Sequence, residues 1–483
     1  MVFNSLQYLL FLPTVLVLFW LCPFKWRIPI LLVASYIFYA SWRPIYLFLI
    51  LGMTVANYFL GIKIADSKDH KKAWMVTGVI GNLLTLAYFK YFYLLEETFI
   101  WAAKPFVGEL PKLDLKIVLP LAISFFVFEF IHYLVDVYKG KSEPVKDPLS
   151  FALFPAFFPT QVAGPIKRVQ DFLPQLKIES KFKREDLDQG CFLILNGLFK
   201  KVLLADNLAL FVTGGFSNPE LMTSLDVWIC AAAFSFQVYF DFSGYADIAR
   251  GSAQLFGYKV PLNFKFPYLS GSITDFWRRW HITLGSWLRD YLYFPMGGSK
   301  NGRFRASLNL IITMTLCGLW HGAGWHLVAW GFYHGLLLTA HREFSHFREH
   351  HPKFLTVLDT KVGHMFSVAL TFASFCVGIV IFRSDNIFIG LQMVQKMLFL
   401  NGLFNADHNL STIAGINYPL IFSSILFVLP VFWVGQLVCQ EVIKRFPPTQ
   451  VPQVVRVVYA TALIFMIVAF APDSSPRFIY YQF

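Results

Sequence analysis

The sequence predicts an all-α, polytopic membrane protein. Hydrophobic residues make up 56% of its 483 residues and charged residues only 14%, whereas soluble domains carry about 25% charged residues. Apolar stretches of about 20 residues recur, which is the length that a helix needs to cross a bilayer. The basic residues lie in short loops between these stretches. The formal net charge of +12 therefore indicates membrane topology, and we expect no nucleic-acid partner.

The apolar stretches predict about eleven or twelve spanning helices embedded in the lipid bilayer. In chain order they cover residues 6–22, 29–42, 45–62, 73–94, 115–138, 188–213, 224–250, 306–340 (as two short helices), 361–383, 414–440 and 455–472. The segment Met1 to Leu21 has no basic n-region and no small-residue cleavage site, so we interpret it as a first span rather than a signal peptide. Because no repeat or long linker divides the chain, we expect a single membrane domain over residues 1–483.

Loop charges predict the orientation of the chain, because loops rich in lysine and arginine stay in the cytoplasm. Such loops follow the first and the third candidate spans and precede the last one. Their basic residues are Lys25, Arg27, Lys63, Lys68, Lys71, Lys72, Lys444, Arg445 and Arg456. This pattern predicts that the N-terminus and the C-terminal tail from Pro472 are both extracytoplasmic.

Two segments depart from the spanning pattern. Residues 149–166 are apolar but are interrupted by prolines, which break helix interiors. Broken backbone at membrane depth is tolerated only where protein buries it or where it lines a cavity, so we predict a re-entrant segment. Residues 263–300 are too charged to span, and their Trp and Tyr residues suit an interface. We predict short amphipathic helices there, at the cytoplasmic surface.

Ionisable residues between Phe276 and Gly324 give the strongest indication of function, since each such group costs about 2.5–3.5 kcal/mol at the bilayer centre. His321 lies in an apolar run beside Gly318 and Gly322. A neutral imidazole can act as a general base near pH 7. The alternative is a buried histidine that is hydrogen-bonded to a backbone carbonyl.

His281 is the second candidate, because it follows a cluster of arginines. Arginine forks suit an anionic ligand such as the phosphates of coenzyme A. The alternative is an interfacial helix whose arginines snorkel to water. The candidate substrate-binding or tunnel-lining residues of these segments are Trp277, Arg278, Arg279, Trp280, Arg289, Asp290 and Trp320.

A third polar group contains Asp241, Ser243, Tyr245 and Asp247. Their spacings of three and four residues, with Arg250 nearby, allow a polar stripe on one helix face. We favour an internal pairing network that fixes helix packing, and a tunnel-lining role is the alternative.

The remaining histidines and the cysteines are weaker candidates. We expect His326 and His334 to line the same cavity as His321. A charged, solvated loop is expected to contain His341, His346, His350 and His351. The six cysteines are scattered without a CxxC motif, which predicts neither disulfides nor a metal site.

Four motifs resemble the membrane-bound O-acyltransferase (MBOAT) family, specifically its bacterial alginate O-acetylation branch. They are YFDFSGY at 239–245, FWRRWH at 276–281, WLRDYL at 287–292 and LWHGA at 319–323. Further matches are Ala163 to Pro165, Phe199 to Lys201, Phe382 to Ser384 and the C-terminal tail. The resemblance covers nearly the whole chain, with a signature core at about 115–342 and no departure in the core motifs.

The resemblance implies a fold in which a ring of helices surrounds a central tunnel. It implies that His321 is the essential histidine and that His281 is the second one. An aromatic tail over residues 472–483 would place Tyr480 at the centre as an acyl acceptor, since Phe478, Tyr480 and Phe483 have the spacing of the Phe-x-Tyr-x-x-Phe tail of related systems. The alternative for the tail is an aromatic anchor at the membrane interface.

The implied activity is transfer of acetyl groups across a bacterial inner membrane for O-acetylation of an exopolysaccharide such as alginate. Acetyl-CoA or another cytoplasmic acyl donor is the expected substrate, and no bound cofactor is expected. The expected partners are an extracytoplasmic acetyltransferase of the SGNH-hydrolase type and the polysaccharide itself. Alternatives are peptidoglycan, cellulose or another envelope glycan as acceptor. A D-alanyl transferase is less favoured, and a transporter of polysaccharide or acyl donor belongs to a different class.

Overall fold

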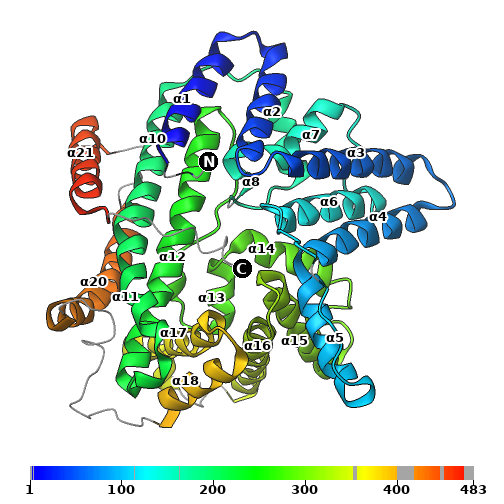
Figure 1. Cartoon of the computed structure of the whole chain (residues 1–483). Helices are drawn as coiled ribbons and strands as arrows, with labels where there is room; N and C mark the ends of the chain where they lie inside the picture. The colour runs from blue at the N-terminus through cyan, green and yellow to red at the C-terminus, as the bar shows by residue number, and fades with distance from the viewer. Residues whose placement is uncertain are drawn as a thin grey trace. The chain divides into compact units, whose positions relative to one another are not determined.

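The structure is a computed structural model, shown in Figure 1. It describes residue 3 and residues 5–113, 115–162, 164–351, 356–399, 418–445 and 451–472, with side chains left out at 418–428 and 443. Every regular element within these ranges is helical. The prediction of an all-α membrane fold is therefore confirmed, whereas the central tunnel stays a prediction.

The helices have the following bounds, which reproduce the predicted spans within a few residues at most ends. They are α1 (Leu6–Leu21), α2 (Phe24–Ala40), α3 (Ile45–Asp66), α4 (Lys71–Leu86), α5 (Phe92–Val107), α6 (Ile123–Tyr138), α7 (Pro148–Ala156), α8 (Phe158–Gln161), α9 (Val169–Leu176), α10 (Arg184–Leu198), α11 (Asp206–Ser217), α12 (Ser224–Leu255), α13 (Ile273–Arg279), α14 (Ile282–Leu288), α15 (Gly302–His321), α16 (Trp325–His350), α17 (Lys361–Arg383), α18 (Ile387–Phe399), α20 (Tyr418–Arg445) and α21 (Gln453–Phe470). Short π-helical turns join α4 to α5 and α10 to α11.

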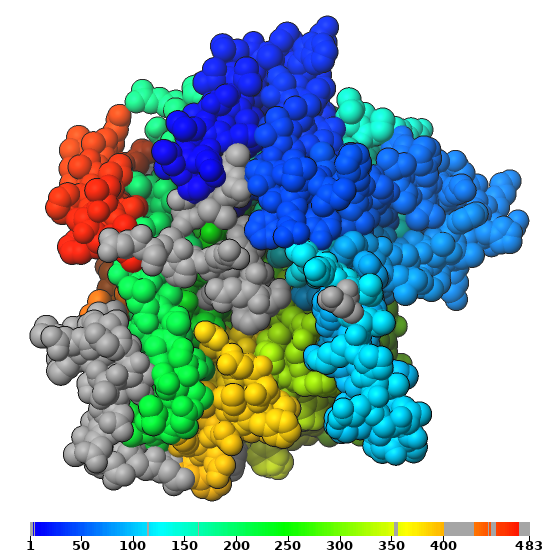
Figure 2. All heavy atoms as spheres, viewed as in Figure 1, coloured from blue at the N-terminus to red at the C-terminus, as the bar shows by residue number. Residues whose placement is uncertain are grey.

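Five helices in the described ranges are long and apolar enough to cross a membrane. They are Ile45–Asp66, Lys71–Val107, Ser224–Leu255, Lys361–Arg383 and Gln453–Phe470. Helix α21, red in Figure 2, leaves nearly all of its apolar side chains on the surface. Such a surface suits lipid contact, and the chain is a multi-pass membrane protein. The total of eleven or twelve spans stays a prediction.

One predicted helix end is wrong. The stretch expected to end near residue 94 continues without a break to Val107, giving a helix of 37 residues. Glu96 and Glu97 interrupt the apolar pattern just after the predicted end. Glutamate is a good helix former, so loss of hydrophobicity did not mean loss of helix.

The chain forms two compact units. The first contains Met1–Gly197 and Tyr245–Leu262, and the second contains Leu198–Gly244 and Asn263–Phe483. Helix α12 contributes residues to both. The expectation of one membrane domain over the whole chain stays a prediction.

The first unit contains the predicted re-entrant segment, which is broken as expected. Helix α7 ends at Ala156 and α8 starts at Phe158, with Phe157 in a non-helical conformation between them. Nearly all of its side chains are buried, which meets the requirement for broken backbone in a membrane. The Lys167 ammonium then binds the Glu129 carboxylate at 3.0 Å and the Thr160 hydroxyl at 2.8 Å, which anchors the following turn to α6.

The second unit contains the short helices expected in residues 263–300, namely α13 and α14. Its helices α15 and α16 form a hairpin in which the two backbones are in direct contact. A Cβ atom on Gly318 would collide with the carbonyl oxygen of Leu327, and one on Gly331 would collide with that of Met314. Small residues let helices approach in this way, and Gly331 and Gly335 have the spacing of a GxxxG motif.

Candidate functional site

His321 occupies the last turn of α15 and is only 5% exposed. The centres of three aromatic rings lie close to its imidazole: Trp320 at 5.0 Å, Trp330 at 5.1 Å and Phe382 at 5.5 Å. The tight hairpin explains this cage, because it brings Trp330 on α16 against the end of α15. A general base requires a neutral imidazole.

His281 lies between α13 and α14 in the left-handed backbone region, with φ 41° and ψ 56°. This conformation is uncommon for a residue with a side chain and is typical of functional positions. Asn263 stabilises the turn: its backbone oxygen accepts from the Ile282 N–H at 3.0 Å, and its side-chain oxygen accepts from the Thr283 hydroxyl at 2.7 Å. The strained turn directs the imidazole inward, where it is 1% exposed.

The His281 imidazole is neutral. Burial lowers its pKa from the ordinary value of 6.5 to about 3, because the charged form loses its hydration. Neither ring nitrogen has a hydrogen-bond partner among the described residues. An imidazole in this state has one donor and one acceptor to offer to a ligand.

The structure brings the two predicted histidines to the same indole. The ring centre of Trp320 lies 6.2 Å from that of His281 and 5.0 Å from that of His321. His281 also packs edge-on against Phe242 at 4.7 Å. The two imidazoles therefore belong to one aromatic cluster, although they come from different helices.

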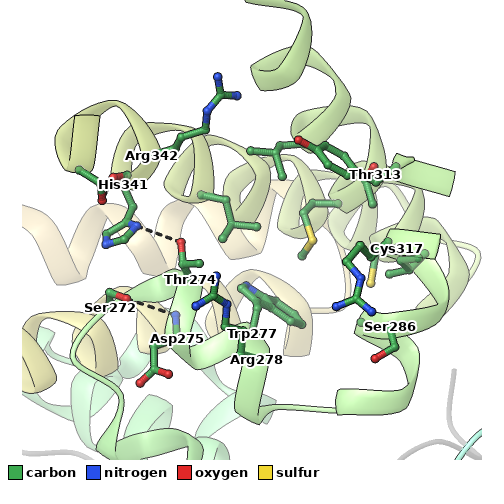
Figure 3. Close-up of a pocket in the computed structure, with 18 of the residues that line it drawn as sticks. Ser272, Thr274, Asp275, Trp277, Arg278, Ser286, Thr313, Cys317, His341 and Arg342 are labelled. Carbon is green, nitrogen blue, oxygen red and sulfur yellow. Dashed lines mark hydrogen bonds between the residues drawn. The ribbon is translucent and has the colours of Figure 1, made fainter. Parts of the chain in front are cut away.

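A cavity of about 950 Å³ opens beside this cluster (Figure 3). Its walls come from α13 to α16, and His281 and Trp277 form part of them. The arginines that line it are Arg278, Arg289, Arg303 and Arg342. Such a volume is typical of a small-molecule site.

The charge of the cavity favours an anion. Three carboxylates also line it, namely Asp275, Glu343 and Glu349. Asp275 is bound by both Nε and Nη2 of Arg279, at 3.0 and 2.9 Å, and Glu349 faces His346 at 3.5 Å. Arg278, seen in Figure 3, makes no ion pair within the described part of the chain. Guanidinium groups bind phosphate in a forked geometry.

Residues 34–368 match the family model of the membrane-bound O-acyltransferases. The chain belongs to this family. It is therefore a membrane acyltransferase, and the resemblance drawn from the sequence motifs is confirmed.

Several relatives are similar to this MBOAT protein over most of their length. The "Probable alginate O-acetylase AlgI" of Pseudomonas syringae is 39% identical over 425 residues, covering 86% of this chain and 79% of that protein. The protein of the same name from Pseudomonas aeruginosa is 37% identical, with 92% and 84% covered. The "Peptidoglycan O-acetyltransferase" of Helicobacter pylori is 36% identical, with 83% and 80% covered.

The structure also places the other sequence-predicted residues of this MBOAT site. Trp277, Arg278 and Arg289 line the cavity, and Asp290 is the ion partner of Arg289 at 2.9 Å. Arg279 is bound to Asp275, which lies four residues before it on α13. Trp280 is buried in the aromatic core, 5.1 Å from the ring centre of Phe264.

The pairing network favoured for the third polar group is present. Within the second unit, Asp241 binds the Lys201 ammonium at 2.9 Å, and Asp206 binds the same ammonium at 2.6 Å. Within the first unit, Asp247 and Arg250 pair at 3.5 Å. Ser243 and Tyr245 are buried neighbours of Asp241 on α12. The sequence pattern did not assign Lys201 to this network, although a lysine within an apolar stretch demands a partner.

Two expectations about the other histidines need correction. Helix α16 continues through the supposed loop to His350, and both His341 and His346 line the cavity. His341 contacts the Thr274 hydroxyl at 2.9 Å, as Figure 3 shows. The charged pattern after residue 340 predicts a loop, but alternating charges also suit a helix end. Neither His321 nor His334 lines this cavity, so the expectation that they share one stays a prediction.

Tyr480 and the aromatic tail after Pro472 lie outside the described residues, so the acceptor role of this tyrosine stays a prediction. Among the described residues, no group of three His, Cys, Asp or Glu side chains gathers as metal ligands do.

Proposed function

We propose that this protein transfers acetyl groups from acetyl-CoA, bound in the arginine-lined cavity, toward the hydroxyl groups of an envelope polysaccharide. The observation that carries the proposal is the continuity of the site. His281 forms part of the cavity wall, and the rings of both His281 and His321 lie beside the Trp320 ring. A donor held by the arginines would thus extend toward the proposed base.

Coenzyme A suits the cavity in both size and charge. Its diphosphate and ribose phosphate are anionic, and the arginines on α13, α15 and α16 present donors from different walls. Ion pairs between guanidinium and phosphate are strong and directional. The thin pantetheine arm is the part that would reach past Trp277 and His281.

His321 supplies the base in this proposal. The hydroxyl oxygen of the acceptor attacks the thioester carbon while the imidazole takes the hydroxyl proton. The carbon–sulfur bond then breaks, and the coenzyme A thiolate takes the proton from the imidazolium. Binding both reactants at one site replaces a bimolecular encounter and can supply roughly 7–11 kcal/mol of the barrier reduction.

We propose Tyr480 as the first acceptor. A phenol has a pKa near 10 and is a poor nucleophile at neutral pH, so it needs a base such as His321. The acetyl group would next pass to an extracytoplasmic SGNH-hydrolase-type transferase and then to the polysaccharide. In this scheme the donor side is cytoplasmic, both termini are extracytoplasmic and the membrane is a bacterial inner membrane.

The printed names of the relatives support an O-acetylated polysaccharide and favour two acceptors. Alginate is favoured by the Pseudomonas proteins, which share 37–39% identity with this chain. Peptidoglycan is favoured by the Helicobacter protein at 36%. Because the Pseudomonas proteins have the slightly higher identity, alginate is our first candidate and peptidoglycan the second.

Labelled acetyl-CoA tests the proposal. Membranes containing the protein receive the labelled donor, and the C-terminal peptide is analysed by mass spectrometry, with His321→Ala as the control. We expect label on Tyr480 that disappears in the variant, together with release of free coenzyme A. If no coenzyme A is released, the proposed use of acetyl-CoA as donor is wrong. Glycan acetylation without label on Tyr480 would mean direct transfer to the partner.

A further inference from the structure

Trp277, Trp330 and His334 form a second aromatic group behind the cavity wall. The centres of the two indoles are 5.9 Å apart, and the His334 ring lies 5.2 Å from Trp277 and 4.9 Å from Trp330. Trp277 lines the cavity, and Trp330 lies 5.1 Å from His321. The group therefore lies between the proposed donor site and the proposed base.

Within the described part of the chain, the polar atoms of this group have no hydrogen-bond partners. These atoms are the indole nitrogens of Trp277 and Trp330 and both ring nitrogens of His334, and all four are buried. Trp330 is 3% exposed and His334 is 0% exposed. A buried polar atom without a partner is destabilising, and four of them in one place indicate a site that a polar ligand completes.

The chemistry of these atoms defines the ligand. An indole N–H can only donate a hydrogen bond, and a neutral imidazole has one donor and one acceptor. The ligand atom between the indoles must therefore be an acceptor, such as a carbonyl oxygen. The surroundings are apolar, since Phe375 lies 6.2 Å from His334 and Phe382 lies 5.2 Å from Trp330. Hydrogen bonds to developing charge are stronger in such a medium.

We propose that the indole N–H groups of Trp277 and Trp330, held together by His334, bind the carbonyl oxygen of the acyl group during transfer. This inference rests on the proposed function, because it takes the thioester to lie beside His321. Trp277 and Trp330 are catalytic residues in this scheme, since they touch the reacting atoms. His334 is a positioning residue that packs against both indoles.

The reaction assigns the two N–H groups a definite task. When the acceptor oxygen bonds to the thioester carbon, the electron pair of the carbonyl double bond moves onto its oxygen, and His321 holds the hydroxyl proton. The oxyanion is stabilised by the indole donors. It then reforms the double bond and expels the thiolate, which takes the proton from His321. Donors fixed in position before the reaction stabilise the oxyanion more than the ground-state carbonyl.

Substitution of each indole by a phenyl ring tests the proposal. Trp277→Phe and Trp330→Phe keep an aromatic ring but remove the N–H. Loss of one oxyanion donor costs about 10²–10³-fold in kcat, and we expect that loss with little change in the KM for acetyl-CoA. Trp433→Phe is the matched control, because its indole donates to the Tyr268 carbonyl at 3.0 Å, outside the site. We expect the control to stay within a few-fold of the unmodified protein.

A second replacement separates hydrogen bonding from shape. Benzothienylalanine at position 330 keeps the two-ring outline and replaces the N–H by sulfur. We expect the same loss of kcat as in Trp330→Phe, with an unchanged melting temperature in detergent. Full activity of this protein would overturn the proposal, as would phenyl variants that lower only the affinity for acetyl-CoA. If the phenyl variants are fully active and His321→Ala is inactive, this inference alone is wrong. If the unmodified protein releases no coenzyme A, the proposed function is wrong.

Discussion

Replacing Lys201 by methionine should destabilise the second unit strongly. The Lys201 ammonium binds two carboxylates, Asp206 at 2.6 Å and Asp241 at 2.9 Å, and all three side chains are at most 2% exposed. Methionine has a similar length but no charge, so the variant leaves two buried carboxylates facing each other. Removal of one partner from a buried ion pair costs about 3–5 kcal/mol.

This free energy can be measured as a melting temperature in detergent. A change of 1 kcal/mol shifts the melting temperature by roughly 2–4 °C for folding units of 150–250 residues, so we expect Lys201→Met to melt about 6–20 °C lower than the unmodified protein. Lys200→Met is the matched control, because the side chain of this neighbouring lysine is only half-buried. We expect a much smaller shift there.

A rescue variant separates charge from packing. In Lys201→Met combined with Asp206→Asn and Asp241→Asn, no uncompensated charge is left, so we expect most of the lost stability to return. If Lys201→Met melts within 2 °C of the unmodified protein, the three side chains do not form a stabilising network and the reasoning is wrong. If the triple variant melts as low as the single one, packing rather than charge explains the loss.

Three further outcomes follow from the site. Arg278→Ala should raise the KM for acetyl-CoA about tenfold, as expected for loss of one hydrogen bond to a charged group, and should leave kcat nearly unchanged. The control is Arg305→Ala, since Arg305 lies outside the cavity, and both variants are measured by steady-state kinetics. The pKa of His281 is lower in the folded protein than in the unfolded chain. Its contribution to stability is therefore complete above about pH 6.5 and is lost as pH falls toward 3. Asparagine tolerates the left-handed backbone, so His281→Asn should show a smaller fall in melting temperature between pH 7 and pH 5 than the unmodified protein. Thr283→Val removes the 2.7 Å hydrogen bond to Asn263 and should cost about 1 kcal/mol, whereas Thr283→Ser should melt like the unmodified protein.

The sequence predicted the helices better than their ends. Apolar length located the spans, because lipid imposes a minimum length on any crossing helix. It could not locate Val107 as the end of its helix, since helix formation continues through polar residues. The histidines of 341–346 were misplaced for the same reason: loss of hydrophobicity resembles a loop until packing shows that the helix continues.

The histidine pair was predicted, but its environment was not. His321 and His281 were distinguished by their ionisable side chains in an apolar chain and by their motifs. The position of Trp330 beside His321 was not predicted, because the sequence has 13 tryptophans and does not show which of them are neighbours in space. The Lys201 network was also missed, since a partner 40 residues away along the chain cannot be found from helical spacing.

The backbone contact between α15 and α16 has a consequence for how the site assembles. Residues 314 to 335 contain the glycines of the hairpin, His321 and Trp330, so this part of the site depends on contacts between residues close in sequence. Local contacts form early and at a small entropic cost. His281 reaches Trp320, the neighbour of His321, only through a turn fixed by Asn263. Partial unfolding should therefore separate the two histidines while His321 still lies within its aromatic cage, so loss of activity should precede loss of the hairpin.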